Sequence, residues 1–130
     1  MKQVKDMVAA ANAQVDHAPA AALLDLHGQE DVTFVDMRDP RELEREGMIP
    51  GAFHCPRGML EFWIDPNSPY AKPQFQTGNR FVFYCASGWR SALSAQTAQN
   101  MGLPNVSHVE DGFSGWKKAG GPVGDKPAKS

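Results

Sequence analysis

The run RFVFYC at residues 80–85 constrains the fold of this chain more than any other segment. After its first residue it is apolar or aromatic throughout, without the alternation that marks a half-buried strand. Such a run is typical of a central strand in a parallel sheet, where helices cover both faces. Residues 91–102 then read as a helix that ends at Gly102, a residue type that commonly terminates helices. We therefore predict a strand, a short loop and a helix, the repeating unit of α/β proteins.

The rest of the chain alternates between strands and helices in the same way. Asp39, Pro40 and Glu42 form the pattern of a capping box, so a short helix begins there and stops at Gly47. We predict an α/β fold: one domain with a central, mainly parallel five-stranded sheet and helices on both faces. Functional sites in such sheets form at the carboxyl ends of central strands. The other predicted strands lie at 14–17, 32–36, within 49–56 and at 106–110, and the other helices at 2–13, 19–28, 57–64 and 113–120.

The length of 130 residues suits one domain with a sizeable core. Near the N-terminus, Val4, Met7, Val8 and Ala11 recur at helical spacing, which predicts an amphipathic helix with these residues on its packing face. The end of the chain is polar and rich in proline and glycine, which favours mobility. The predicted division is an N-terminal helix at 1–14, part of the domain or packed on it, the domain at 15–122 and a flexible tail at 123–130.

The composition and charge exclude several classes of protein. A formal net charge of −2 gives no reason to expect nucleic acid or an anionic membrane as a partner. No apolar run approaches the roughly 18 residues that span a bilayer, and the charged N-terminal stretch makes a poor signal peptide. We therefore expect a cytoplasmic protein with two free thiols, Cys55 and Cys85, although their spacing alone does not exclude a bridge. The four histidines lack metal-ligand spacing, and His108, on a predicted strand, is the candidate to face the site.

Cys85 stands where the central strand gives way to a loop and a helix. Such a loop points backbone N–H groups at its centre and the helix dipole adds positive potential, so a thiolate nucleophile and an incoming anion are both stabilised. Gly88 permits a turn with positive φ, and Ser87 and Ser91 add hydroxyl donors. Arg90 adds a planar, permanently charged donor group. A strand-end cysteine by itself is more often a small buried hydrophobe. The serine, glycine and arginine residues that follow Cys85 favour a nucleophile instead.

Three segments of the chain resemble one known family. Residues 34–56 (FVDMRDPRELEREGMIPGAFHCP), 84–91 (YCASGWRS) and 109–123 (VEDGFSGWKKAGGPV) look like the first signature, active-site loop and C-terminal signature of single-domain rhodaneses. The resemblance implies a rhodanese-like domain and a sulfurtransferase that moves a sulfane sulfur from thiosulfate or 3-mercaptopyruvate onto Cys85. The Cys85 persulfide then passes this sulfur to a thiophilic acceptor, cyanide or a thiol. No metal and no organic cofactor is implied.

The resemblance also implies the residues of the site and their partners. Cys85 is the expected catalytic nucleophile, and Trp89 either lines the entrance or is an exposed docking residue. The expected partners are a small-molecule sulfur donor, a thiol or cyanide acceptor and, as an open alternative, a protein that accepts sulfur. The substrate-binding residues implied are those of the loop after the cysteine: Ala86, Ser87, Gly88, Trp89, Arg90 and Ser91.

Two other functions stay open at this point. One is a persulfide relay or binding module that serves a protein partner without turning over small molecules. The other is a phosphatase or an arsenate reductase. The related enzymes of this kind on this fold have a longer active-site loop, with the pattern Cys-x5-Arg. The loop from Cys85 to Arg90 holds six residues, one fewer, which favours the sulfurtransferase branch. Arg90 either grips a substrate anion or fixes the loop through a carboxylate.

Several residues near these motifs have simpler interpretations. Asp36 and Arg38 follow the family pattern of a structural ion pair, and Glu42 is a helix cap or a partner of Arg38. Cys55 stands at a position that is usually aliphatic in the family, so a packing thiol is expected rather than a resolving cysteine. Asp111 departs from the family, which commonly has glycine there, and this affects the rim or charge of the site.

Overall fold

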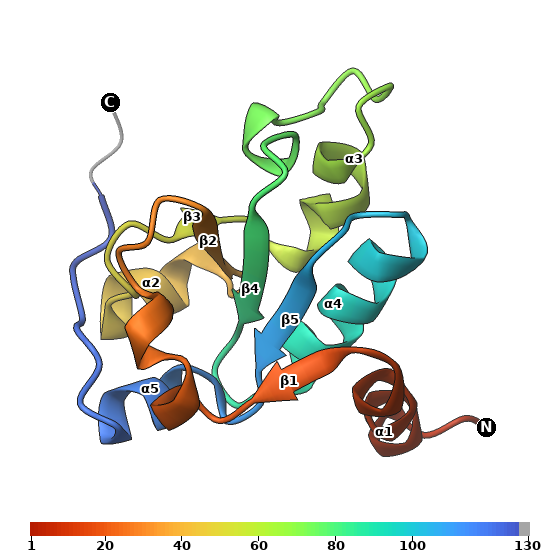
Figure 1. Cartoon of the computed structure of the whole chain (residues 1–130). Helices are drawn as coiled ribbons and strands as arrows, with labels where there is room; N and C mark the ends of the chain where they lie inside the picture. The colour runs from red at the N-terminus through yellow and green to blue at the C-terminus, as the bar shows by residue number, and fades with distance from the viewer. Residues whose placement is uncertain (128–130) are drawn as a thin grey trace.

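The computed structural model describes residues 1–127, and it contains an all-parallel sheet of five strands flanked by helices (Figure 1). The strand order is β1-β5-β4-β2-β3, with β4 at the centre and flanked by β2 and β5. This confirms the predicted α/β fold, and the sheet is parallel throughout. The strands are β1 (Asp16–Ala18), β2 (Val32–Asp36), β3 (Phe53–His54), β4 (Arg80–Tyr84) and β5 (Val106–Val109).

Helices lie on both faces of the sheet, as Figure 1 shows, with α3 and α4 on one side and α2 and α5 on the other. The capping box of α2 is formed as predicted: Asp39 accepts from the backbone of its first turn and Glu42 reaches back to the Asp39 N–H. No helix within residues 1–127 is long and apolar enough to cross a bilayer. The helices are α1 (Val4–Gln14), α2 (Pro40–Glu46), α3 (Leu60–Ile64), α4 (Trp89–Asn100) and α5 (Gly112–Lys118).

The central strand β4 packs into a separate core on each face. Phe83 joins the core that contains Ala95 of α4, and Tyr84 joins the core that contains Phe113 of α5. All four of these side chains are 2% exposed or less. Burying a large side chain this fully contributes roughly 2 kcal/mol. The continuous apolar run is therefore explained by two buried faces.

The segment at 19–28, predicted as one helix, forms two short 3-10 turns instead, Ala20–Ala22 and Leu24–Leu26. Each turn closes only short-range hydrogen bonds, such as the bond from the Leu23 N–H to the Ala20 carbonyl at 2.9 Å. The Ala20 N–H is bound instead by Asp111 Oδ1 at 2.8 Å. Docking against the start of α5 therefore replaces the regular helix in this segment.

Helix α1 packs against α4, but through a narrower face than the sequence predicts. Val8 and Ala11 are buried with Ala92 of α4. Val4 and Met7, predicted on the same face, are 49% and 40% exposed. The prediction was wrong for these two because only the part of α1 that faces α4 finds a partner.

The start of the predicted flexible tail makes contacts that the sequence does not predict. Gly124 and Met48 exchange two backbone hydrogen bonds of 2.9 and 2.8 Å as an antiparallel bridge. The Trp116 indole N–H donates to the Pro122 carbonyl at 2.8 Å. Residues 128–130 lie outside the described part of the chain, and flexibility over 123–130 stays a prediction.

Candidate active site

Cys85 follows β4 directly, and its sulfur lies at the N-terminus of the 12-residue helix α4. The backbone N–H of Gly88 donates to Sγ at 3.2 Å, and that of Ser91 donates at 3.4 Å. The helix dipole adds positive potential at the same place. The side chain is buried, with the residue 1% exposed. Two converging N–H groups suit a sulfur atom that carries negative charge.

The close turn of this loop requires glycine at position 88. Gly88 adopts φ of +102°, a left-handed conformation that side chains disfavour. A Cβ atom there would lie 2.1 Å from the backbone oxygen of Glu110. The loop is therefore pressed against the end of β5, and this contact holds the Gly88 N–H on the sulfur.

Helix α5 binds the outer side of the same loop. The Phe113 N–H donates to the Cys85 carbonyl at 2.7 Å, and the Ser114 N–H donates to the Ala86 carbonyl at 3.2 Å. Gly112 approaches so closely that a Cβ would lie 2.5 Å from the Ala86 carbonyl group. Because these carbonyls are held outward, N–H groups of the loop are free to face inward. The C-terminal signature thus has a direct role in shaping the loop.

Arg90 is fixed by a carboxylate. Its guanidinium forms two bonds with Glu42, of 2.8 and 2.9 Å, while Glu42 also caps α2. The Arg90 hydrogen bond lowers the pKa of Glu42 to about 2, and the same pairing raises the pKa of Arg90. Glu42 is therefore the helix cap that the sequence predicts, and its ion pair is with Arg90 and not with Arg38, the alternative. The Arg90 side chain remains 41% exposed beside the loop.

Asp36 and Arg38 form a fully buried ion pair between β2 and the surrounding loops. Arg38 donates to both carboxylate oxygens, at 2.9 and 2.7 Å, and to the Gly47 carbonyl at 2.8 Å. Its guanidinium also lies 4.5 Å from the centre of the Phe113 ring. Breaking a buried pair of this kind typically costs about 3–5 kcal/mol. The pair joins β2, the end of α2 and α5, as the structural interpretation expects.

His108 is connected to the Cys85 sulfur through the hydroxyl group of Ser91. Its Nδ1 lies 3.0 Å from Ser91 Oγ, which in turn lies 3.6 Å from Cys85 Sγ. Its Nε2 lies 2.7 Å from the amide oxygen of Asn12 on α1. Burial, and secondarily the charge of His17, lowers the pKa of His108 to about 4. The only sequence signal for this role was a histidine on a buried strand, and nothing indicated Asn12.

The remaining predicted loop residues surround the sulfur at different depths. Ala86 is half-buried, Ser87 is exposed, and Trp89 is 50% exposed at the start of α4. Ser91 is fully buried beside Cys85. Ala86 and Ser87 lie in the loop, whereas Trp89 and Ser91 lie in the first turn of α4. Their contact with substrate stays a prediction.

Asp111, which departs from the family pattern, holds the end of β5 to the segment after β1. Its Oδ1 accepts from the Ala20 N–H at 2.8 Å. A Cβ on Gly115 would lie 2.1 Å from the same carboxylate. The carboxylate thus lies against its own helix and this turn, away from the sulfur.

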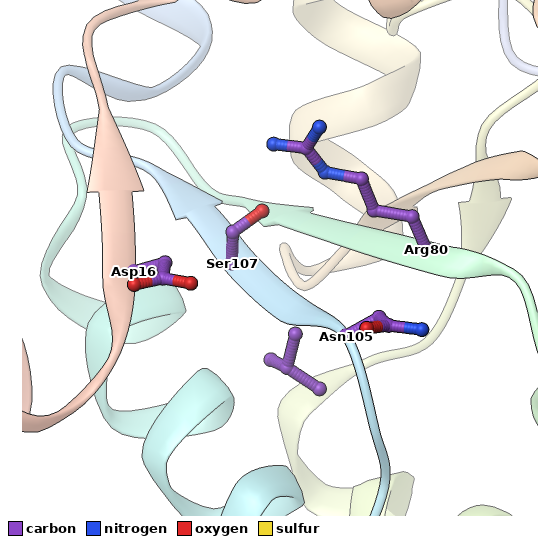
Figure 2. A pocket seen from close by; sticks show the side chains of 5 residues that line it. Asp16, Arg80, Asn105 and Ser107 are labelled. Carbon is purple, nitrogen blue, oxygen red and sulfur yellow. The ribbon is translucent and has the colours of Figure 1, made fainter.

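A polar cavity lies at the opposite end of the strands from Cys85, as Figure 2 shows. This cavity of about 290 Å³ is lined by the amino ends of β1, β4 and β5, through Asp16, Arg80, Asn105, Val106 and Ser107. The lining contains no thiol and no imidazole. Within residues 1–127, moreover, no three His, Cys, Asp or Glu side chains lie together as a metal site requires. The candidate nucleophile Cys85 lies instead at the carboxyl end of β4.

Comparisons with known proteins agree with this geometry. A protein of unknown function from Rhodopseudomonas palustris, described as a possible tyrosine phosphatase, shares 56% identity and superimposes with a TM-score of 0.93, covering 95% of this chain and 96% of that one. The polysulfide-sulfur transferase of Wolinella succinogenes shares 29% identity with a TM-score of 0.65, covering 94% of this chain and 87% of that one.

A curated relative, an uncharacterised protein of Synechocystis, is 33% identical over 117 residues, which cover 90% of this chain. The match spans only 60% of that relative's length. The rhodanese-like domain itself matches residues 19–119, from the turn after β1 to the end of α5. With most of the chain matched and the three signatures meeting around Cys85, this protein belongs to the rhodanese-like domain family.

Proposed function

We propose that this protein is a sulfurtransferase that carries a sulfane sulfur as a persulfide on Cys85. The observation that carries the proposal is the convergence of the Gly88 and Ser91 N–H groups on the Cys85 sulfur, at 3.2 and 3.4 Å. A persulfide has a terminal sulfur with negative charge, which needs donors of this kind. The loop after Cys85 and the first turn of α4 provide them from the backbone.

The chemistry proceeds through two displacements at sulfur. The Cys85 thiolate attacks the sulfane sulfur of thiosulfate, a new S–S bond forms, and sulfite leaves with the electron pair of the old bond. An acceptor such as cyanide or a thiolate then attacks the terminal sulfur of the persulfide. The Cys85 thiolate leaves with the electron pair of the S–S bond, which regenerates the starting state.

The donor and acceptor are proposed by class. Thiosulfate and 3-mercaptopyruvate both present a sulfur beside a negatively charged group, which suits the positive potential at the N-terminus of α4. The likeness to a polysulfide-sulfur transferase supports sulfur transfer as the reaction class. A thiol, cyanide or a partner protein accepts the sulfur. Two free buried cysteines suit a reducing compartment such as the cytoplasm.

Phosphate ester hydrolysis is the second candidate, because the R. palustris relative is described as a possible tyrosine phosphatase. The loop holds six residues, fewer than the Cys-x5-Arg loops that enclose a tetrahedral phosphate. In addition, Glu42 occupies two donor groups of Arg90, which leaves less of the guanidinium for a phosphoryl oxygen. Both observations favour sulfur transfer.

The test measures thiocyanate formation from cyanide with thiosulfate or 3-mercaptopyruvate as donor. We expect activity in the wild type and in the matched control Cys55→Ser, and none in Cys85→Ser. Hydrolysis of an aryl phosphate is measured with the same three proteins. Wild-type thiocyanate formation no faster than that of Cys85→Ser, together with phosphate release that depends on Cys85, would overturn the proposal.

A persulfide module that serves only a protein partner is distinguished in the same experiment. It would acquire sulfur on Cys85 from a cognate donor yet form thiocyanate no faster than Cys85→Ser. Turnover with either small donor contradicts that alternative.

A further inference from the structure

A chain of hydrogen bonds leads from the Cys85 sulfur to the N-terminal helix. It runs from Sγ to Ser91 Oγ at 3.6 Å, from there to His108 Nδ1 at 3.0 Å, and from His108 Nε2 to Asn12 Oδ1 at 2.7 Å. The three side chains come from α4, β5 and α1. Cys85, Ser91 and His108 are each 1% exposed or less, so water does not supply these bonds.

The last link in the chain sets the direction of all the others. The Asn12 amide oxygen only accepts, so His108 Nε2 carries the proton and Nδ1 has a free lone pair. Ser91 therefore donates its hydroxyl proton to Nδ1. The lone pairs of Ser91 Oγ remain for the Cys85 thiol, which donates to them. The side chains are thus ordered as a path for a proton away from sulfur.

We propose that Ser91, His108 and Asn12 form a proton relay that deprotonates Cys85 before it attacks the sulfur donor, an inference that rests on the proposed role of Cys85 as nucleophile. The S–H bond breaks, its electron pair stays on sulfur, and its proton passes to Ser91 Oγ. At the same time the Ser91 hydroxyl proton passes to His108 Nδ1. One proton has left sulfur and one has reached the imidazole, and Ser91 is unchanged.

The product of this transfer leaves each of these polar groups with a partner. The thiolate accepts from the backbone N–H groups of Gly88 and Ser91 and from the Ser91 hydroxyl. The imidazolium of His108 donates to Ser91 Oγ through Nδ1 and to Asn12 through Nε2. The opposite charges of thiolate and imidazolium lie on either side of one hydroxyl group. His108 and Asn12 are positioning residues, since only Ser91 touches the sulfur.

The charged groups around the relay decide when this transfer takes place. Burial lowers the pKa of His108 to about 4, so the imidazole is neutral at pH 7 and holds a proton there only while the thiolate beside it supplies the counter-charge. His17 on β1 faces it, with ring centres 5.7 Å apart, and binds Glu110 at 2.8 Å. Beside the sulfur, Arg90 is paired with Glu42. Among residues 1–127 no carboxylate bonds His108 directly, so the thiolate is the main counter-charge for its protonated form.

Asn12 offers the sharpest test because two substitutions push the relay in opposite directions. Asn12→Asp places a carboxylate on His108 Nε2, which favours the imidazolium and hence the thiolate. Asn12→Leu removes the hydrogen-bond acceptor of His108 Nε2, which disfavours the imidazolium and hence the thiolate. Asn12 is half-buried and lies far from the loop in sequence, so Cys85 and Ser91 are unchanged. Gln14→Leu is the matched control, since Gln14 lies on the same helix and bonds only exposed partners.

The readout is the rate at which iodoacetamide alkylates Cys85 between pH 5 and 9, followed by mass spectrometry of the Cys85 peptide. We expect the midpoint of the pH profile to fall by about one unit in Asn12→Asp and to rise by about one unit in Asn12→Leu, a tenfold change in rate in each direction. Gln14→Leu keeps the wild-type midpoint. Circular dichroism establishes that each variant is folded.

Nitrogen NMR of His108 gives a second, direct readout in the wild type. We expect the wild-type imidazole to lose its proton at a higher pH than the imidazole of Cys85→Ser, because the thiolate beside it supplies a counter-charge. Equal midpoints in both Asn12 variants, with an imidazole that titrates alike in the wild type and in Cys85→Ser, overturn the relay.

Alkylation needs no sulfur donor, which separates the relay from the proposed function. Shifted midpoints without thiocyanate formation refute sulfur transfer alone. Thiocyanate formation with unshifted midpoints refutes the relay alone.

Discussion

The two cysteines of this protein occupy similar positions yet have opposite surroundings. Each is buried, and each directly follows a parallel strand, Cys85 after β4 and Cys55 after β3. The Cys85 sulfur accepts two backbone N–H groups, whereas the polar contact of the Cys55 sulfur is the Pro56 carbonyl at 3.8 Å, an acceptor. Burial raises the pKa of Cys55 to about 12, so it stays a neutral packing thiol. Burial at a strand end therefore does not make a nucleophile.

The difference begins with the residue that follows each cysteine. Ala86 opens a loop that curls into the N-terminus of the 12-residue helix α4. Pro56 has no N–H to offer, and it is followed by a short 3-10 turn, Arg57–Met59, that leads into the five-residue helix α3. The direction of the next few N–H groups decides which thiol is supported as an anion.

The largest expected effect separates the two thiols directly. Cys85→Ser should lower sulfur transfer at least about a thousandfold, because the nucleophile is lost. Cys55→Ser should keep activity within about threefold, since only packing changes. Thiocyanate formation under saturating thiosulfate measures both. Comparable losses of sulfur transfer in the two variants would contradict the distinction between a reactive Cys85 and a packing Cys55.

A matched pair of glycines tests the loop geometry. Gly88 and Gly58 each lie three residues after a cysteine, but of these two only Gly88 has positive φ and a close neighbour. Apart from its chain neighbours, no atom of the described residues lies within 4 Å of a Cβ on Gly58. Gly88→Ala should lower the free energy of unfolding by at least about 2 kcal/mol and sulfur transfer about a hundredfold. Gly58→Ala should change the free energy of unfolding by less than about 1 kcal/mol.

Urea unfolding and thiocyanate formation, measured on both glycine variants, provide the comparison. An active, stable Gly88→Ala protein would contradict the account of the loop.

The prediction from sequence succeeded where the signal was local. The Cys85 loop, the capping box of α2 and the central strand are each defined by residues within a few positions of one another. Contacts between distant segments were missed: Glu42 reaches Arg90 across 48 residues and His108 reaches Asn12 across 96. Such pairings depend on strand order and helix packing, which no short pattern contains.

The segment at 19–28 failed for a related reason. Its alanine and leucine content favours a helix, but docking against α5 and the bond from Ala20 to Asp111 produce two 3-10 turns. Local propensity was overruled by a tertiary contact.

The surroundings of Cys85 also include a buried titratable imidazole. Because the folded protein holds the pKa of His108 at about 4, below its unfolded value of about 6.5, the unfolded chain binds more protons. The neutral His108 imidazole contributes about 3 kcal/mol to the free energy of unfolding. This contribution is complete above pH 6.5 and is lost as the pH falls to about 4.

Urea unfolding between pH 7 and 4 measures this dependence. His108→Gln, which keeps amide hydrogen-bonding groups at the position, should lose about 3 kcal/mol less over this range than the wild type. Circular dichroism at pH 8 establishes that both proteins are folded. If their free energies of unfolding then change equally with pH, the proposed contribution of His108 is refuted.

The smallest effect compares the ion pair beside each cysteine. Arg90 binds Glu42 through two bonds, whereas Arg57 in its 3-10 turn binds Glu61 of α3 through one exposed bond of 2.9 Å. With its pKa lowered to about 2, Glu42 contributes stability above about pH 4.5 that is lost as the pH falls towards 2. Solvent around the exposed Arg90 screens the pair, so Glu42→Gln should lower the free energy of unfolding at pH 7 by about 1 kcal/mol.

Glu61→Gln is the control, with an expected loss of a few tenths of a kcal/mol at most. Thermal unfolding at pH 7 and pH 3 resolves the two. An equal loss in the free energy of unfolding of both variants would mean that the two-bond pair of Arg90 and Glu42 stabilises the fold no more than the single-bond pair.

The most direct test of the central claim is the intact mass of the protein after incubation with thiosulfate, followed by peptide mapping. We expect the mass of one added sulfur atom on Cys85, its removal by cyanide, and the same result in Cys55→Ser. A protein that gains no sulfur on Cys85 from thiosulfate, 3-mercaptopyruvate or polysulfide, or that gains it only on Cys55, would contradict the account.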